Sequence, residues 1–308
     1  MNLIERLKQL PEPQKTYLEI LEVHDKEVPI ANLLAFFFRK KEAHGLGDVF
    51  IKALLKTKFY ELDVKKHSES TGALISQGNT EKEQQSSILN SISNVEVETE
   101  VKTSEDNDDN KRIDILIDTE KFVICIEFKI NHKLNNPLET YRNHIEKTYK
   151  DVDKQIFYIV LTPSKKEADV SNPQYYLEKN QIFKQVILSH FMKNVQSELP
   201  SDFEDNDAFQ YYTDFIQTIQ NREIRYKRGL LLERLKMSLM SKRIESVYHS
   251  NSKGGFIEVD KNNYFLKIRI ENGKFQIEKW IHQKEKTIEE YLDLNTPLEE
   301  VVRNISAY

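Results

Sequence analysis

The chain has 308 residues, of which 39% are hydrophobic and 31% are charged, and its formal net charge is −5. This composition is typical of a soluble globular protein, and the length allows one large domain or two modest ones. A negative net charge argues against a protein that coats DNA nonspecifically, but it is compatible with a local basic groove. The single cysteine, Cys125, lies in an apolar run, which excludes a disulfide framework and a zinc site built from cysteines.

No membrane or secretory signal is evident in the sequence. The N-terminus lacks an apolar leader segment, and no apolar run approaches the roughly 18 residues of a membrane-spanning helix. A lone cysteine without a partner also fits a reducing compartment. We therefore expect a cytoplasmic protein with no membrane partner.

The first predicted core element is a helix over residues 27–39. Its leucine- and phenylalanine-rich run at residues 33–38 is broad enough to be buried on most sides. Glu27 lies in the first turn, where the helix dipole favours an acid. A turn is predicted next at His44-Gly45-Leu46-Gly47, and His44 has two interpretations, a contact with phosphate or a cap of the preceding helix.

A polar segment and a half-exposed strand follow. Residues 63–91 predict an exposed excursion that flanks a substrate groove. Residues 95–101 alternate between glutamate and β-branched residues, which predicts a strand with one exposed face. Its glutamates either form a solvated face or bring one acid, Glu98 or Glu100, toward a site.

The most informative stretch of the chain is a predicted hairpin of two apolar strands, residues 113–117 and 123–130. Each strand carries charge where a strand buried on both faces should carry none. A lone buried charge is very expensive, so these charges must be paired, bound to metal or strongly shifted in pKa. The hairpin is therefore the first place to look for a functional site.

The register of this hairpin decides which charges meet. If Asp118 pairs with Val123 across the short polar link, Asp114 lies directly opposite Glu127. Their side chains then stand on the same face of the sheet with Cβ atoms about 4.5–5.5 Å apart. A slip of one residue would turn Asp114 to the opposite face.

Two carboxylates at this spacing repel each other unless a cation lies between them. Carboxylate oxygens suit Mg²⁺, which binds oxygen at about 2.0–2.1 Å and keeps several waters. Lys129 lies on the same face as Glu127, and together they predict a metal-plus-lysine site that polarises a phosphate and orients a water. The alternative is an ordinary cross-strand ion pair of Lys129 with Asp114 or Glu127, and the local pattern does not decide between the two.

After the hairpin, the spacing of Leu138, Tyr141 and Ile145 predicts an amphipathic helix, and residues 155–162 predict a buried strand. The order of elements is then helix, three strands, helix and strand. This order suits a mixed sheet covered by helices.

The C-terminal part of the chain changes character. Residues 181–249 are helical in pattern, and a cluster of Lys and Arg over residues 225–243 either lines a phosphate groove or forms a solvated helical face. Three strands are predicted at residues 256–259, 264–270 and 275–280, and a closing helix from Thr287. Tyr264 and Trp280 either stack on bases or belong to the core of this small sheet.

These motifs together resemble a known group of nucleases. Arg112-Ile113-Asp114, the hairpin and Ile126-Glu127-Phe128-Lys129 resemble the core of the PD-(D/E)XK nuclease superfamily. Within it, the chain is similar to one bacterial family with a glutamate-led helix, a leucine-rich run, a His-Gly-Leu-Gly turn and a later strand ending in Leu-Thr-Pro. The matching positions here are Glu27, residues 33–38, residues 44–47 and residues 157–163. The resemblance covers roughly residues 20–165.

The resemblance implies a fold, a cofactor and roles for four residues. The fold is an α/β, restriction-endonuclease-like core, a mixed central sheet flanked by helices, with helical additions and a small C-terminal β-rich appendage. Asp114 and Glu127 hold the metal, with the backbone carbonyl of Phe128 as a further ligand. Lys129 helps to activate water and stabilises the transition state, and Glu27 tunes the metal or its water. The expected metal is Mg²⁺, for which Mn²⁺ can substitute.

The expected activity is hydrolysis of phosphodiester bonds in nucleic acid by metal-activated water, with DNA as the expected substrate and an endonuclease as the class of enzyme. The alternative is a catalytically weakened protein of nuclease fold that binds nucleic acid or serves as a phage-defence interaction module. The superfamily's glutamine at the start of the helix after the hairpin is replaced by Pro137, which supports the alternative.

Three segments are expected along the chain. A nuclease core with N-terminal helices occupies residues 1–165, and a helical extension packed on the core occupies residues 166–249. A small α+β appendage occupies residues 250–308.

Overall fold

The computed structural model describes residues 14–61, 92–103, 111–130, 134, 136–163, 182–250, 254–261, 263–281 and 285–308. The polar excursion expected at residues 63–91 lies outside them. The chain divides into two compact units: the first is Tyr17–Ile216, and the second is Gln217–Tyr308 with the described residues before Tyr17. The three-segment division expected from the sequence stays a prediction.

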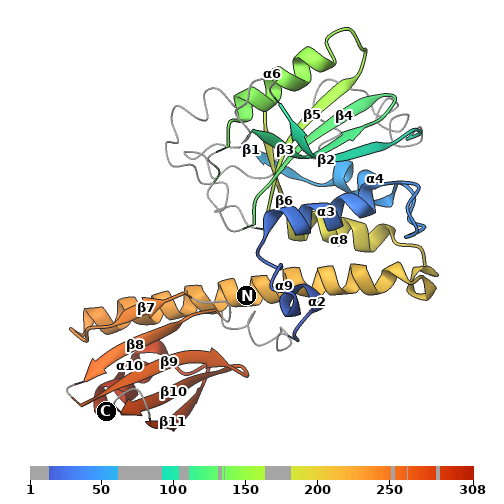
Figure 1. Ribbon diagram of the computed structural model, residues 1–308. Helices are drawn as coiled ribbons and strands as arrows, with labels where there is room; N and C mark the ends of the chain where they lie inside the picture. Colours follow the sequence, from blue (N-terminus) through green and yellow to red (C-terminus); the bar gives the residue numbers. More distant parts are fainter. Residues whose placement is uncertain are drawn as a thin grey trace. The chain divides into compact units, whose positions relative to one another are not determined.

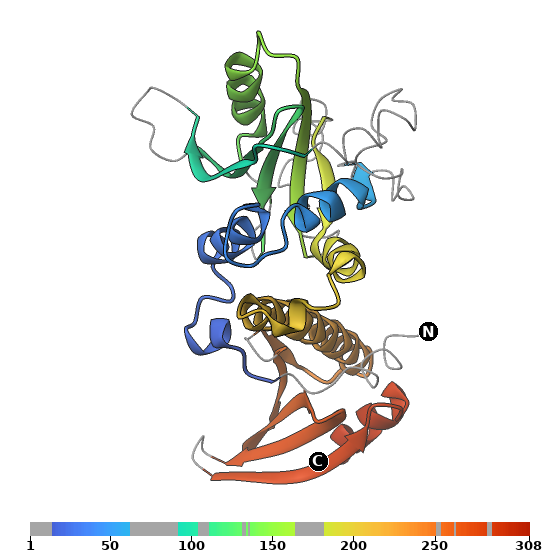
Figure 2. The same cartoon turned by 90° about the vertical axis from the view of Figure 1, so that its right-hand side faces the viewer.

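The first unit is a mixed sheet flanked by helices, as expected from the sequence. The sheet has the order β1-β6-β5-β4-β3-β2, with β2, β3 and β4 antiparallel and β4, β5 and β6 parallel. Its strands are β1 (Phe59–Glu61), β2 (Glu96–Lys102), β3 (Arg112–Asp118), β4 (Phe122–Phe128), β5 (Gln155–Thr162) and β6 (Lys184–Ile187). Its helices are α2 (Tyr17–Ile20), α3 (Glu27–Phe38), α4 (Val49–Lys56), α6 (Leu138–Thr148), α8 (Leu188–Glu198), a 3-10 turn (Phe203–Asp205) and the start of α9 (Ala208–Ser241). Figures 1 and 2 show α6 on one side of the sheet and α3, α4 and α8 on the other.

Strand β4 is the centre of the first unit. All of its residues are buried, because β3 and β5 pair with its two edges and helices cover both faces of the sheet. On one face, Cys125 packs with Tyr141 and Ile145 of α6. Cys125 is therefore a small buried hydrophobic residue, as its apolar surroundings in the sequence indicate.

The other side of the unit is built from stacked aromatic rings. Phe37 of α3 stacks on Phe50 of α4 with ring centroids 4.8 Å apart, and Phe38 stacks on Phe191 of α8 at 5.9 Å. Such offset contacts add to the free energy gained by burying the rings. The broad apolar run at residues 33–38 is therefore buried among helices, as its sequence predicts.

His44 caps helix α3. The ring is fully buried, its Nε2 lies 2.9 Å from the carbonyl oxygen of Arg39, and its Nδ1 accepts a 2.9 Å hydrogen bond from the N–H of Leu46. These partners require a proton on Nε2, and burial lowers the pKa of the imidazole. Of the two interpretations of His44, the structure supports the cap of the preceding helix.

His44→Leu is expected to destabilise the protein by about 2–4 kcal/mol, since the part-buried carbonyl of Arg39 and the buried N–H of Leu46 would each lose a partner. Thermal unfolding monitored by circular dichroism measures this change. His190→Leu is the control, because His190 is exposed and its replacement should stay within about 0.5 kcal/mol. Equal effects of the two substitutions would contradict the capping role.

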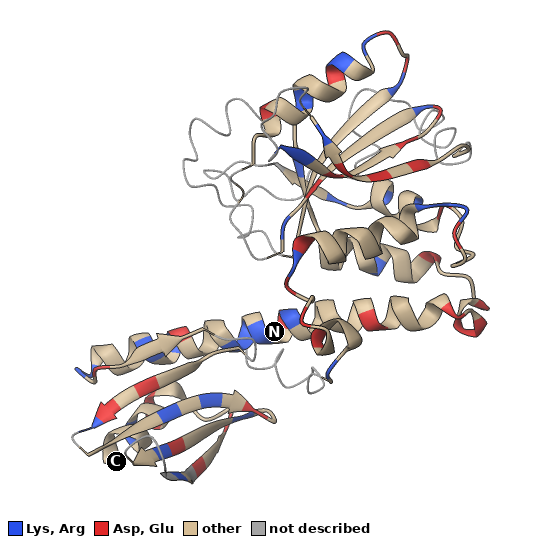
Figure 3. Cartoon of the chain, in the orientation of Figure 1, with Lys and Arg blue, Asp and Glu red and all other residues tan. Residues whose placement is uncertain are grey.

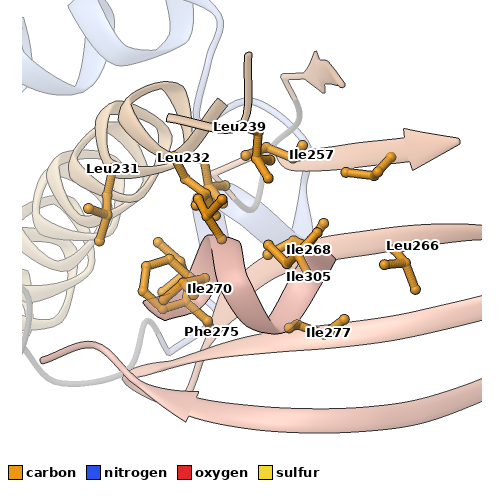
Figure 4. Close-up of a cluster of buried hydrophobic side chains, with 14 of the residues drawn as sticks. Leu231, Leu232, Leu239, Ile257, Leu266, Ile268, Ile270, Phe275, Ile277 and Ile305 are labelled. Atoms are coloured by element: carbon orange, nitrogen blue, oxygen red, sulfur yellow. The ribbon is translucent and has the colours of Figure 1, made fainter. Parts of the chain in front are cut away.

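The second unit is an antiparallel sheet covered on one face by helices. Its order is β11-β10-β9-β8-β7, and its strands are β7 (Val247–His249), β8 (Phe256–Lys261), β9 (Tyr264–Glu271), β10 (Lys274–Ile281) and β11 (Glu285–Asp293). Helix α10 (Leu298–Ala307) and the C-terminal part of α9 supply Ile305, Leu232 and Leu239, which pack on the sheet (Figure 4). The small β-rich appendage expected from the sequence is confirmed in its three strands β8, β9 and β10.

Two local expectations are wrong. Thr287 does not begin a helix but lies in β11, whose pairing with β10 overrides the helical tendency of this glutamate-rich segment; the closing helix begins at Leu298 after Pro297. Likewise, residues 184–187 do not continue a helix but form β6, which fills the place beside β5 in the first sheet. In both segments, pairing with a neighbouring strand decided the local structure.

No helix in the described part of the chain has the length and the apolar character that crossing a membrane requires.

Candidate active site

Strands β3 and β4 pair in the register that the sequence predicts and then separate. Four residue pairs, from Asp118 with Val123 to Ile115 with Ile126, form the ladder. Beyond this ladder, a side chain replaces the backbone as hydrogen-bond acceptor: Oδ2 of Asp114 accepts a 2.7 Å hydrogen bond from the N–H of Phe128. Strand β4 meanwhile stays paired with β5 through Phe128. The strands therefore diverge at the point where the sequence places two carboxylates on one face.

Glu127 lies at this point with unused hydrogen-bonding capacity. Its side chain is fully buried, and Lys129 Nζ lies 2.8 Å from Oε1 as an ion pair. Among the described residues, neither carboxylate oxygen of Glu127 accepts a hydrogen bond of good geometry. Burial, followed by the charge of Asp114, raises the pKa of Glu127 well above its usual range. A buried carboxylate in this state favours a cation beside it.

Lys129 is held by both its backbone and its side chain. Its N–H donates a 3.0 Å hydrogen bond to the carbonyl oxygen of Leu161 in β5. Its ammonium lies 2.9 Å from Oε2 of Glu27 as well as beside Glu127. Burial opposes the charge, but the two carboxylates outweigh it and raise the pKa of Lys129. The ion pair with Glu127 that the sequence offered as an alternative is therefore present, and it leaves Oε2 of Glu127 without a partner in the described residues.

Glu27 joins the N-terminus of α3 to the segment that follows β4. Its Oε2 accepts the hydrogen bond from Lys129, and its Oε1 accepts a 3.2 Å hydrogen bond from the N–H of Ile130. Glu27 is thus more than an acid placed favourably at a helix end. The structure brings together all four residues that the sequence singles out, namely Glu27, Asp114, Glu127 and Lys129.

The pKa of Asp114 is raised to about 6. Burial is the largest cause, and the charges of Glu27 and Glu100 add to it, whereas the hydrogen bond from Phe128 and the charge of Lys129 oppose it. The carboxyl group therefore resists ionisation in the absence of a further cation.

Glu100 is the member of the β2 glutamates that faces Asp114. The β2–β3 register pairs Thr99 with Ile115 and Val101 with Ile113, so Glu100 lies opposite Asp114. Its backbone has a φ of 56°, which is uncommon for a residue other than glycine. Its carboxylate forms a 3.5 Å ion pair with Arg112. Of the two glutamates left open by the sequence, Glu100 is the one nearer the site.

Tyr141 was not among the predicted site residues, yet it borders the site. It is buried in α6, and its hydroxyl accepts a 3.3 Å hydrogen bond from the side chain of Asn136. Burial, followed by the charge of Glu127, raises the pKa of this phenol. In the sequence, Tyr141 is indistinguishable from any aromatic residue on the apolar face of an amphipathic helix.

The residues of this cluster fit a hard divalent cation in charge and chemistry. The ammonium of Lys129 contacts the carboxylates of Glu27 and Glu127 and feels the charge of Asp114, and Oε2 of Glu127 has no partner in the described residues. Within the described residues, no three His, Cys, Asp or Glu side chains are arranged as a ready set of ligands. A metal here would therefore use Asp114 and Glu127 together with backbone oxygen and water, which is how Mg²⁺ is commonly held.

Comparison with known families agrees with this arrangement. A family model described as the PD-(D/E)XK nuclease superfamily matches residues 16–290 and so includes the whole cluster. No curated protein and no solved structure matches the chain. Members of the superfamily are generally metal-dependent nucleases. The match spans most of the sequence, and the chain therefore belongs to the PD-(D/E)XK nuclease superfamily.

Proposed function

We propose that this chain is a Mg²⁺-dependent endonuclease that hydrolyses phosphodiester bonds, with DNA as its substrate and the cytoplasm as its compartment. The observation that carries the proposal is the state of Glu127. It is fully buried next to Asp114, its pKa is raised by burial and by that neighbour, and one of its oxygens has no partner in the described residues. Such a carboxylate is costly for folding and useful for holding a cation.

The proposed mechanism assigns a task to each side chain. Asp114 and Glu127 would hold the metal, with the carbonyl of Phe128 as a further ligand. When bound, the metal supplies Lewis-acid activation of the phosphate and of a water. The ammonium of Lys129 neutralises charge that develops on the phosphate oxygens. Glu27 keeps the ammonium charged and fixes its direction through the 2.9 Å hydrogen bond.

The test is metal binding and cleavage measured together. The wild-type chain is expected to nick plasmid DNA with Mg²⁺ or Mn²⁺ and to lose this activity in EDTA. Glu127→Gln should weaken Mg²⁺ binding, measured by calorimetry, by at least about tenfold, since even groups that only support metal ligands cost 10–100-fold. Asp118→Asn is the matched control, because Asp118 is a carboxylate of the neighbouring strand β3 that pairs with Lys154 instead.

Two results would contradict the proposal. One is cleavage that persists in EDTA, and the other is Mg²⁺ binding that is equal in Glu127→Gln and wild type. The alternative function, a catalytically weakened protein of nuclease fold that binds nucleic acid or serves as a phage-defence interaction module, predicts no metal-dependent cleavage. The same experiment therefore decides between the two functions.

A further inference from the structure

The sheet of the second unit has one face that none of the described helices and strands of that unit covers. Leu266, Ile268 and Phe275 point into the core beneath α9 and α10 (Figure 4). Strand alternation places their sequence neighbours on the opposite face. We name this the outer face of the C-terminal sheet, and its residues used below are Phe256, Phe265, Lys267, Arg269, Trp280 and Lys286.

The outer face carries large aromatic rings where a solvent-facing sheet would usually carry small polar residues. Phe265 and Trp280 are cross-strand partners, and their rings stand parallel at 6° with centroids 6.0 Å apart. Phe256 stacks on the ring of His249 at 4.7 Å. Tyr291 of the neighbouring strand β11 is 51% exposed. The phenylalanines and the tryptophan are half-buried, so part of each ring is open to contact.

Charged residues are interspersed with these rings along the strands (Figure 3). Glu278 is buried at this face, where its Oε1 lies 2.7 Å from both Arg269 and Lys286 and its Oε2 accepts a 3.0 Å hydrogen bond from Trp280. These contacts hold the indole ring in place. They also neutralise Arg269 and Lys286 within the protein.

Lys267 is different from these two cations. Its ammonium lies 4.1 Å from the ring centroid of Phe256 and 5.7 Å from that of Trp280. Within the described residues it forms no ion pair, although Glu258 and Glu278 are its cross-strand neighbours. The outer face thus holds a cation without a carboxylate partner, set among half-open aromatic rings.

We infer that the outer face of the C-terminal sheet binds a single strand of nucleic acid, with bases stacked on its rings and a phosphate at Lys267. Unpaired bases expose their faces, whereas a duplex hides them, and each base stacked on an aromatic side chain improves affinity by about fivefold or more. An ammonium that forms no ion pair within the described residues, set beside the rings, supplies the charge that a phosphate needs. The choice of nucleic acid as the partner rests on the proposed function, whereas the description of the surface rests on the structure alone.

Trp280 makes this inference directly measurable, since it is the only tryptophan of the chain. The full-length protein is titrated in EDTA with a single-stranded oligothymidylate while tryptophan fluorescence is recorded. We expect saturable quenching by the single strand and at least about fivefold weaker binding of a duplex of the same length. Quenching reports contact at the outer face, independently of cleavage.

Substitutions then locate the contact. Phe265→Leu and Lys267→Gln should each weaken the single-strand affinity by about fivefold or more, and Lys267→Gln should also reduce the dependence on salt. Tyr226→Leu is the aromatic control and Arg234→Gln the cationic control, because both residues are exposed on α9. Neither control should change the affinity. Circular dichroism verifies that each variant is folded.

Two outcomes would overturn the inference. The first is binding, measured by fluorescence anisotropy of a labelled oligonucleotide, without any change in tryptophan emission or without an effect of Phe265→Leu and Lys267→Gln. The second is no binding of single strands at all. Either outcome with Mg²⁺-dependent cleavage intact leaves the proposed function standing, whereas quenching without any cleavage would support the surface and refute the nuclease.

Discussion

Lys129→Met is expected to reduce metal-dependent cleavage by roughly 10²–10³-fold, which is the usual cost of removing one charged or polar group that stabilises a transition state. Methionine fills the same buried volume, so the change removes mainly the ammonium. Because Lys129 is not a metal ligand in the proposed mechanism, Mg²⁺ affinity should be unchanged or tighter. Single-turnover cleavage and calorimetry measure the two quantities separately.

The matched control for this substitution is Lys154→Met. Lys154 also forms a short ion pair, 2.6 Å from Asp118. Asp118 ends strand β3, whereas Asp114 and the proposed metal site lie nearer the start of that strand. Its removal should leave cleavage within a few-fold of wild type. If Lys129→Met retains near wild-type cleavage, Lys129 is only an ion-pair partner of Glu127 and Glu27.

Asp114→Asn is expected to stabilise the metal-free protein by about 1–3 kcal/mol. The pKa of Asp114 is raised to about 6 from an ordinary value of 3.8, and a shift of this size corresponds to at most about 3 kcal/mol. Asparagine removes the charge and can still accept the hydrogen bond from the N–H of Phe128 through its own carbonyl oxygen. Thermal unfolding in EDTA measures the effect.

The stability that Asp114→Asn gains over wild type should increase as pH rises. Between about pH 4 and pH 6 the folded wild type binds more protons at Asp114 than the unfolded chain does, so wild-type stability falls as pH rises. The substituted protein lacks this titration. Its advantage should therefore be near zero at pH 4 and complete above pH 6.

Mg²⁺ is expected to reverse the order of stability of wild type and Asp114→Asn. Mg²⁺ that binds only the folded wild type stabilises it by about 2.7 kcal/mol at a hundredfold excess over the dissociation constant, whereas Asp114→Asn should gain little. A variant that unfolds at a lower temperature than wild type in EDTA would show that Asp114 is a structural ion-pair partner. That result would remove the main physical support for the proposed metal site.

The sequence by itself determined the hairpin and the faces of its side chains. A short link between two apolar strands leaves few registers, and a period of two then fixes which residues share a face. For this reason the sequence alone predicts Asp114 and Glu127 on one face, and the observed register of β3 and β4 is the one on which that prediction depends. The burial of the apolar run in α3 is predicted by the sequence in the same way, because exposing an apolar surface of that breadth to water is unfavourable.

Only the tertiary structure decided the contacts between distant segments. The hydrogen bond from Lys129 to Glu27 joins positions 102 residues apart, and nothing local to either residue specifies it. Tyr141 lies beside Glu127 because α6 packs across the sheet, and its own neighbours in the sequence predict only an apolar helical face. The segments that form β6 and β11 became strands because an edge of a sheet was available for each, and such edges exist only once the rest of the sheet has formed. In the same way, alternation placed Trp280 in a strand, but the helices packed on the other face decided that its ring stands on the outer one.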